Sequence, residues 1–134
     1  MILCDYADAP PNVGKLFVSG GGWNRVLANA PALVALGIIV NVPWDQTNRP
    51  HPLLLELVDE DGHRVQLGNP PQDIAQQGQF EAGRPAGAPA GEPIPLPMAF
   101  RRPVLPLPVG GYSWVLSIDG DEEARVSFRA VESL

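Results

Sequence analysis

Hydrophobic and polar residues alternate along much of the chain, and a period of two predicts strands with one buried face. The clearest alternation is in residues 112–118, where large hydrophobic residues occupy every second position and serines lie between them. An acidic turn at residues 119–122 follows, and residues 124–131 alternate in the same way. We therefore predict an antiparallel hairpin with one core face and one solvated face.

A second hairpin is predicted from residues 52–59 and 63–67, which flank an acidic, glycine-containing turn. Weaker patterns predict further strands at residues 2–7, 14–19, 33–42 and 94–100. Residues 33–42 are apolar on both faces, which fits a central strand or a short buried helix, and their β-branched residues favour the strand. Residues 94–100 contain Pro95 and Pro97, so this segment must be an edge strand or an extended surface arm.

Helix signals are poor throughout the chain. Residues 26–33 are interrupted by Pro31, and residues 71–77 have room for one or two helical turns at most. About eight strands with little or no helix predict an all-β fold, an antiparallel β-sandwich that is Ig-like or jelly-roll-like. A closed barrel is the alternative. We expect residues 1–134 to form a single domain, with a Pro/Gly-rich loop at about residues 83–93.

Composition supports a packed core and narrows the classes of partner. The chain has 134 residues, of which 45% are hydrophobic, so a core can form without disulfides or metals. With 9 basic and 15 acidic residues, it lacks the basic face that nucleic acids and anionic membranes require. The single cysteine, Cys4, excludes an intramolecular disulfide. The N-terminus has no basic leader, and the apolar run at 32–40 is too short to span a membrane, so we expect a cytoplasmic protein.

We find no catalytic grouping in the sequence and expect no enzyme, no cofactor and no metal ligand. His51 and His63 form no metal-ligand spacing with Cys4 and are expected in exposed loops. The triple glycine at residues 20–22 lacks both the nucleophile elbow and the Lys-Ser/Thr of a phosphate loop. We interpret it as a bend where Trp23 turns into the core.

Acidic residues concentrate in the two predicted hairpin turns, at residues 59–61 and 119–123. Two such turns at one end of a sandwich could bind calcium through carboxylate oxygens. Neither turn matches the calcium-loop pattern, and hairpin turns use acidic residues and glycine for their own geometry. Calcium binding is therefore the weaker of the two interpretations.

The most distinctive segment is the tryptophan loop, residues 42–51, which joins two apolar strands. In the structural interpretation Trp44 packs over the sandwich end, Asp45 and Asn48 cap the turn, and Arg49 pairs with an acid. In the functional interpretation, an exposed aromatic and arginine patch forms an interaction site. The candidate binding residues are Trp44, Asp45, Asn48, Arg49 and, outside the loop, Trp23.

Several unusual motifs together resemble a family of small bacterial proteins known only as a domain of unknown function. The motifs are Asp5-Tyr6-Ala7, Gly14-Lys15-Leu16, Gly20-Gly21-Gly22-Trp23, Val-Pro-Trp-Asp-Gln-Thr-Asn-Arg at 42–49, a later Gly-Arg-Pro, and Pro-Leu-Pro-x-Gly-Gly-Tyr-x-Trp at 106–114. The resemblance covers nearly the whole chain. It implies a single-domain bacterial protein and brings no activity or site residue with it.

We therefore expect a non-enzymatic module that binds a protein partner or associates with itself, with a homo-oligomer as one possible form. Exposed sheet edges and the proline-rich segment offer places for a partner to dock. The alternative is a small-molecule or carbohydrate-binding module in which Trp23, Trp44 or Tyr112 provides an aromatic platform.

Overall fold

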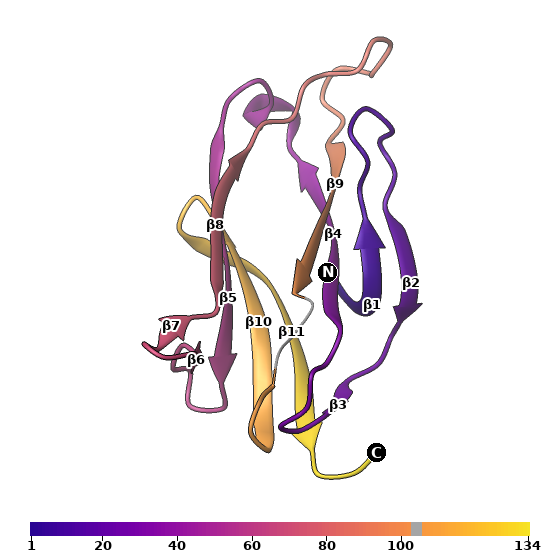
Figure 1. The fold of residues 1–134 in the computed structure, drawn as a ribbon. Helices are drawn as coiled ribbons and strands as arrows, with labels where there is room; N and C mark the ends of the chain where they lie inside the picture. The colour runs from indigo at the N-terminus through magenta and orange to yellow at the C-terminus, as the bar shows by residue number, and fades with distance from the viewer. Residues whose placement is uncertain (103–105) are drawn as a thin grey trace.

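Two β-sheets pack face to face in the computed structural model, which describes residues 1–102 and 106–134 (Figure 1). One sheet has four strands in the order β2-β1-β4-β9, and the other has five in the order β3-β11-β10-β5-β8. The elements are β1 (Ile2–Asp8), β2 (Phe17–Gly21), β3 (Arg25–Leu27), β4 (Val34–Val42), the 3-10 helix η1 (Trp44–Gln46), β5 (His51–Asp59), β6 (Gln66–Leu67), β7 (Gln72–Asp73), β8 (Ala75–Phe80), β9 (Ile94–Arg102), β10 (Gly110–Ile118) and β11 (Asp121–Val131). The predicted all-β sandwich is confirmed. The barrel alternative is wrong, because no strand of one sheet pairs with the other among the described residues.

Inward-facing residues of the two sheets form one hydrophobic core. Large, almost fully buried side chains come from both layers: Leu3, Leu36, Ile38, Leu55, Leu57, Trp114 and Leu116. Each occupies an alternate position on its strand, as the pleat of a strand requires. No helix of the described residues has the length and hydrophobicity to cross a membrane.

The predicted hairpin at the C-terminus is confirmed as β10 and β11, which pair antiparallel from Gly110↔Ala130 to Ile118↔Asp121. Asp119 and Gly120 form its two-residue turn, and both have positive φ, of 54° and 85°. Asp-Gly is a preferred pair for this turn because it tolerates left-handed backbone at both positions. Among the described residues, β11 and β3 form the one parallel strand pair.

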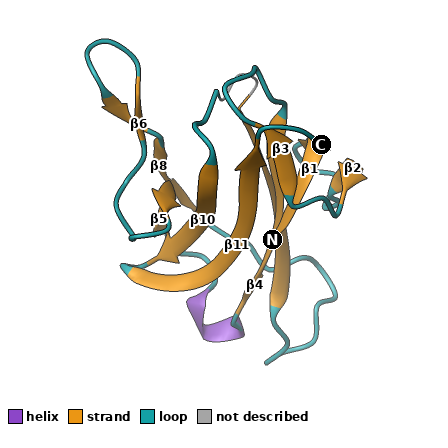
Figure 2. Ribbon diagram, turned by 90° about the horizontal axis from the view of Figure 1, so that it is seen from below, coloured by secondary structure: helices purple, strands orange, loops and turns teal. Residues whose placement is uncertain are grey.

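The second predicted hairpin differs from the structure. Residues 63–65 do turn back on β5: the Asp59 N–H donates to the His63 carbonyl at 2.9 Å, the Val65 N–H donates to the Leu57 carbonyl at 3.0 Å, and Arg64 forms a bridge with Val58. Residues 66–67 then form the short strand β6, which pairs with β7 and not with β5. Figure 2 shows this small hairpin standing out from the body of the molecule. The neighbour of β5 is instead β8, so the helical turns considered for residues 71–77 are absent. Pairing with the buried strand β5 overrides the weak local helix preference there.

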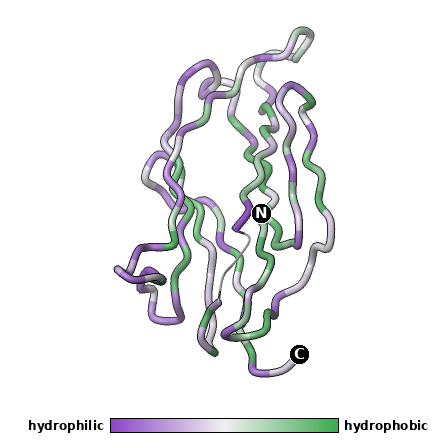
Figure 3. The backbone as a smooth tube through the Cα atoms, in the orientation of Figure 1, coloured by the Kyte–Doolittle hydropathy of each residue, from purple (hydrophilic) through white to green (hydrophobic). Residues whose placement is uncertain are grey.

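The doubly apolar segment is confirmed as β4, a central strand between β1 and β9, and β9 is the edge strand that its prolines predicted. Figure 3 shows how hydrophobic β4 is along its length. Its even-numbered residues Leu36 and Ile38 point into the core, so Gly37 and Ile39 point outward. Residues 83–93, the predicted Pro/Gly-rich loop, contain no strand and connect β8 to β9.

Candidate functional site

The tryptophan loop lies at one end of the sandwich, where it connects β4 to β5. The hydroxyl of Thr47 donates to the carbonyl of Trp44 at 2.7 Å and closes the short helix η1. Asn48 has φ of 59°, and its backbone N–H donates to the carbonyl of Ala82 at 2.8 Å. The loop is therefore fastened to the start of the Pro/Gly-rich loop.

Arg84 is the centre of that attachment. Its guanidinium carbon lies 4.0 Å from the centroid of the Trp44 ring, within the range of a cation–π contact. The same group donates to the Thr47 hydroxyl at 2.7 Å and to the Trp44 carbonyl at 2.8 Å. Trp44 is consequently half-buried, with one face covered by Arg84.

Some of the expected contacts in this loop are wrong. Arg49 was expected to pair with an acid, but its guanidinium donates to the side-chain oxygen of Gln46. Asp45 and Asn48 were expected to cap the turn, and the Thr47 hydroxyl does so instead. Asp45, Asn48 and Arg49 are all exposed at this end of the molecule.

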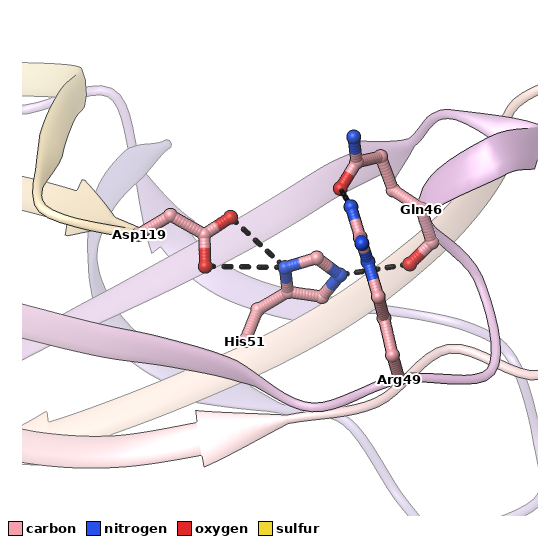
Figure 4. Close-up of polar contacts among 4 residues, drawn as sticks. All are labelled: Gln46, Arg49, His51 and Asp119. Atoms are coloured by element: carbon pink, nitrogen blue, oxygen red, sulfur yellow. Dashed lines mark hydrogen bonds and ion pairs between the residues drawn. The ribbon is translucent and has the colours of Figure 1, made fainter.

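The expectation that His51 lies in an exposed loop is also wrong. His51 begins β5 and is only 5% exposed, with its ring stacked on Phe80 at 5.3 Å between centroids. Its Nδ1 lies 2.9 Å from a carboxylate oxygen of Asp119, and its Nε2 lies 2.7 Å from the carbonyl oxygen of Gln46 (Figure 4). The ring thereby joins the tryptophan loop to the β10–β11 turn. Its carboxylate partner is 68 residues away in sequence, so local sequence gives no signal for it.

Both ring nitrogens of His51 face acceptors, and only the imidazolium has an N–H for each of them. The Gln46 carbonyl is the main cause of a raised His51 pKa, and the Asp119 carboxylate adds to it. Burial and the nearby Arg49 act in the opposite direction. Because both nitrogens are engaged by these acceptors, the ring forms a structural connection between the two segments.

A cavity of about 410 Å³ adjoins His51 between the two sheets. Its walls combine apolar side chains, such as Ile38, Phe80 and Leu116, with polar and acidic ones. The polar and acidic lining residues are Asn41, Gln46, His51, Asp119 and Glu123. This volume is within the usual range of small-molecule sites. The arrangement can accommodate a small apolar molecule.

Trp23 does not join the tryptophan loop. It packs edge-to-face on Phe128 at 6.2 Å, and Phe128 is stacked on Tyr112 at 5.8 Å. These residues lie toward the end of β10 where Tyr112 pairs with Asp59, whereas Trp44 lies at the opposite end of the sandwich, near Asp119. Tyr112 is buried, and its hydroxyl donates to the Pro108 carbonyl at 2.7 Å. The candidate aromatic residues therefore form no common platform.

The two acidic turns lie at opposite ends of β10, so a calcium site that combines them is wrong. In the first turn, Asp59, Asp61 and His63 place side-chain ligand atoms within 4.8 Å of one another. One carboxylate oxygen of Asp59 accepts the backbone N–H groups of Asp61 at 2.9 Å and His63 at 3.0 Å. This is the geometry by which an aspartate stabilises its own turn. His63 is exposed, as expected.

The outer face of the four-stranded sheet is the feature that the search for motifs missed. We define this outer face by its exposed apolar side chains, Ile2 and Tyr6 of β1, Val18 of β2 and Ile39 of β4, and by the outward-facing Ala35, Gly37, Pro97, Ala99 and Arg101. The sequence signal was the apolar character of β4 on both sides. Cys4 is fully buried in a small cluster with Ala7 and Ala35, and this burial raises the pKa of its thiol.

The fold and these surfaces define a small all-β sandwich with an apolar sheet face open to solvent. The chain belongs to a family of unknown function, DUF6941, whose profile matches residues 1–131. The resemblance to a domain of unknown function is confirmed, and the bacterial origin stays a prediction. No curated protein and no solved structure matches the chain with significance.

Proposed function

We propose that this chain is a non-enzymatic protein-interaction module that associates with a second copy of itself through the outer face. The supporting observation is the apolar surface that β4 and its neighbours present on the side away from the core. Antiparallel sheets in two-layer folds usually place polar residues on that side. Here Ile39 is 54% exposed and Tyr6 is 47% exposed. Apolar surface of this kind marks interaction sites.

The centre of the outer face consists of small residues that larger apolar side chains cover. A Cβ at Gly37 would lie about 3 Å from side-chain atoms of Ile2, Leu16 and Val18, so those side chains already close over the glycine. Cys4 and Ala35 beside it are buried. Apolar side chains on a sheet face can pack on another face of the same kind, as in face-to-face sheet packing. A second copy of the chain provides such a face, and most oligomers of one chain are two-fold dimers.

Charge also favours a second copy at this face. The chain carries a net charge of −6, which opposes association through most of its surface. The outward positions of β4 and β9 carry no acid, and their one charged residue, Arg101, lies 5.1 Å from the centroid of the Tyr6 ring. Along β4 and β9, two copies would therefore meet without bringing acidic groups together.

The absence of enzymatic activity is part of the same proposal. Its support is that His51, the buried imidazole beside the cavity, has both nitrogens engaged by acceptors. A cytoplasmic location and the lack of cofactors, nucleic-acid partners and membrane partners stay predictions from composition.

The test is sedimentation of the purified protein across a concentration series, with Ile39→Glu as the disrupting variant. We expect the wild type to be a dimer at high concentration and Ile39→Glu to be a monomer, because a carboxylate would be desolvated in the interface. Val109→Glu is the matched control, since Val109 is also 54% exposed but lies outside the outer face. A wild-type protein that stays monomeric throughout would refute self-association.

A second candidate function, small-molecule binding, is favoured by the 410 Å³ cavity and not by the tryptophans. We expect some small apolar compounds of a thermal-shift library to raise the melting temperature, by mass action on the folded state. Ala124→Leu, which places a larger side chain in the cavity wall, should remove those shifts. Equal shifts in the variant would place the compounds elsewhere, and no shift at all in the wild type would argue against this function.

A further inference from the structure

Strand β8 ends the five-stranded sheet, and its open side faces a groove that runs beside β9. We infer that this edge and groove bind an extended segment of a partner protein, which adds to β8 as an antiparallel strand. The groove shares Pro97 and Ala99 of β9 with the outer face, but the open edge of β8 lies outside that face. The expected occupant of this site is a peptide in extended conformation and not a second copy of the chain. Its test does not depend on self-association.

The hydrogen-bond directions of β5 show which groups of β8 are available. The carbonyl of Pro52 accepts the N–H of Asp119, so even-numbered residues of β5 direct their backbone groups toward β10. Leu57 instead bonds on the other side, since its N–H donates to the Ile74 carbonyl at 3.0 Å. Odd-numbered residues of β5 therefore bond to β8, through pairs such as Leu53↔Gly78 and Leu55↔Gln76.

Backbone groups alternate in direction along a strand, so Ala75, Gln77 and Gln79 point their N–H and C=O groups away from β5. No strand of the described residues lies on that side of β8. These three residues offer the row of donors and acceptors that strand addition uses.

The edge of β8 lacks the features that usually block strand addition. Its sequence, Ala-Gln-Gln-Gly-Gln-Phe, contains no proline and no charged residue. Native edges are normally protected by such residues or by being short. The opposing edge strand β9 is protected, because Pro95 and Pro97 have no N–H to donate. An added strand would therefore pair with β8 and only pack beside β9.

The groove provides room and an apolar floor for the side chains of the added strand. It has a volume of about 350 Å³ and is lined by Leu53, Met98 and Phe100 together with residues of β8. The inward side of Gly78 is open, since no atom lies within 4 Å of the position that its Cβ would take. Apolar side chains at every second position of a bound segment would fill this space.

A smaller hollow of about 50 Å³ continues the groove past Gln76 and Phe100. Trp114 lines this hollow and is 4% exposed, and its indole N–H has no hydrogen-bond partner among the described residues. A buried donor without a partner is costly, so an acceptor on a bound segment would be favoured here.

The charge at the groove end predicts where the segment carries an acidic group. Arg102 lines the hollow at the end of β8 where Ala75 lies, and its side chain is exposed. A segment antiparallel to β8 has its C-terminal end there. The expected partner therefore has alternating apolar residues, no proline at the paired positions and an acidic group toward its C-terminal end.

The test selects binders from a displayed library of short random peptides with the full chain as bait, then titrates a selected peptide by fluorescence anisotropy. The key variant is Gln77→Pro, which removes one outward N–H and leaves the bonds between β5 and β8 in place. Gln77→Thr is its matched control, because threonine keeps the N–H and favours strands. Gly78→Val is a second probe, since it fills the groove and keeps every backbone donor.

We expect selected peptides with the alternation described above, and about tenfold weaker binding to Gln77→Pro and Gly78→Val than to the wild type, corresponding to about 1.4 kcal/mol. Binding to Gln77→Thr and to Ile39→Glu should be unchanged, which separates this site from the outer face. Should Gln77→Pro fail to fold, hydrogen exchange of the wild type decides the question: bound peptide must slow exchange at Gln77 and Gln79. Failure to select any peptide, equal affinity for Gln77→Pro, or protection confined to other strands would overturn the inference.

Discussion

At the scale of single residues, the hydrogen bonds of His51 depend on the protonation state of its ring. A neutral imidazole has one N–H, but the ring sits between the Gln46 carbonyl and the Asp119 carboxylate, which both accept. Loss of the proton therefore leaves a nitrogen lone pair facing an oxygen. Asp119 and Arg49 are the charged groups that act on the ring.

This geometry predicts that the protein loses stability as pH rises. The His51 pKa is raised in the folded state, so its contribution is complete below the unfolded value of about 6.5 and declines as pH passes through the raised pKa. Urea unfolding between about pH 5 and pH 9 measures the effect. His51→Phe, which keeps an aromatic ring against Phe80, should flatten the profile. His63→Phe, at an exposed position, should retain the wild-type slope; equal slopes in wild type and His51→Phe would contradict the assignment.

Sequence alone could not reveal these residue-level contacts. His51 and Asp119 are 68 residues apart, and Arg84 and the Trp44 carbonyl are 40 apart. Neither pair has a local spacing that a helix or turn would impose. The sequence singled out Trp44 as a candidate residue, but it did not indicate that Arg84 covers its ring.

At the scale of elements, Arg84 joins two loops that have no strand pairing to hold them together. Arg84→Ala removes the cation–π contact and two hydrogen bonds, so we expect unfolding to be easier by about 1 kcal/mol, given the exposure of the arginine. Arg84→Lys should recover little, since a lysine cannot reproduce the planar set of donors. Urea unfolding monitored by tryptophan fluorescence measures both variants. Arg49→Ala, which loses one exposed contact, should change the free energy of unfolding little. A loss of stability as large as that of Arg84→Ala would contradict the role of Arg84 in joining the two loops.

Strands with strong alternation, such as β10, were predictable because their apolar and polar residues alternate in the same way as their buried and outward positions. β8 was not, because Ala-Gln-Gly residues have no alternation and weak strand preference. It becomes a strand through its pairing with β5, six residues of contact that only the fold supplies. Pairing that only the fold supplies also decides that β6 pairs with β7 and not with β5.

At the scale of the whole molecule, the sandwich class followed from the number and type of strands, but the placement of the candidate site residues did not. Which loops meet at one end depends on strand order, and strand order separates Trp23 from Trp44 and the acidic turn at Asp59 from that at Asp119. The doubly apolar strand β4 was visible in the sequence. The sequence did not show that no further layer covers the outer side of β4, because that depends on how the two described sheets pack.

The parallel pairing of β3 with β11 also constrains when the chain can fold during synthesis. Arg25 to Leu27 pair with Arg129 to Val131, and β10 needs β11 on one side as well. A nascent chain that has not yet released β11 from the ribosome lacks the strand that joins β3 to β10, while the hydrophobic β4 has already emerged. The five-stranded sheet can therefore be completed only after β11 has been synthesised, and until then the apolar β4 lacks the layer that covers its inner side.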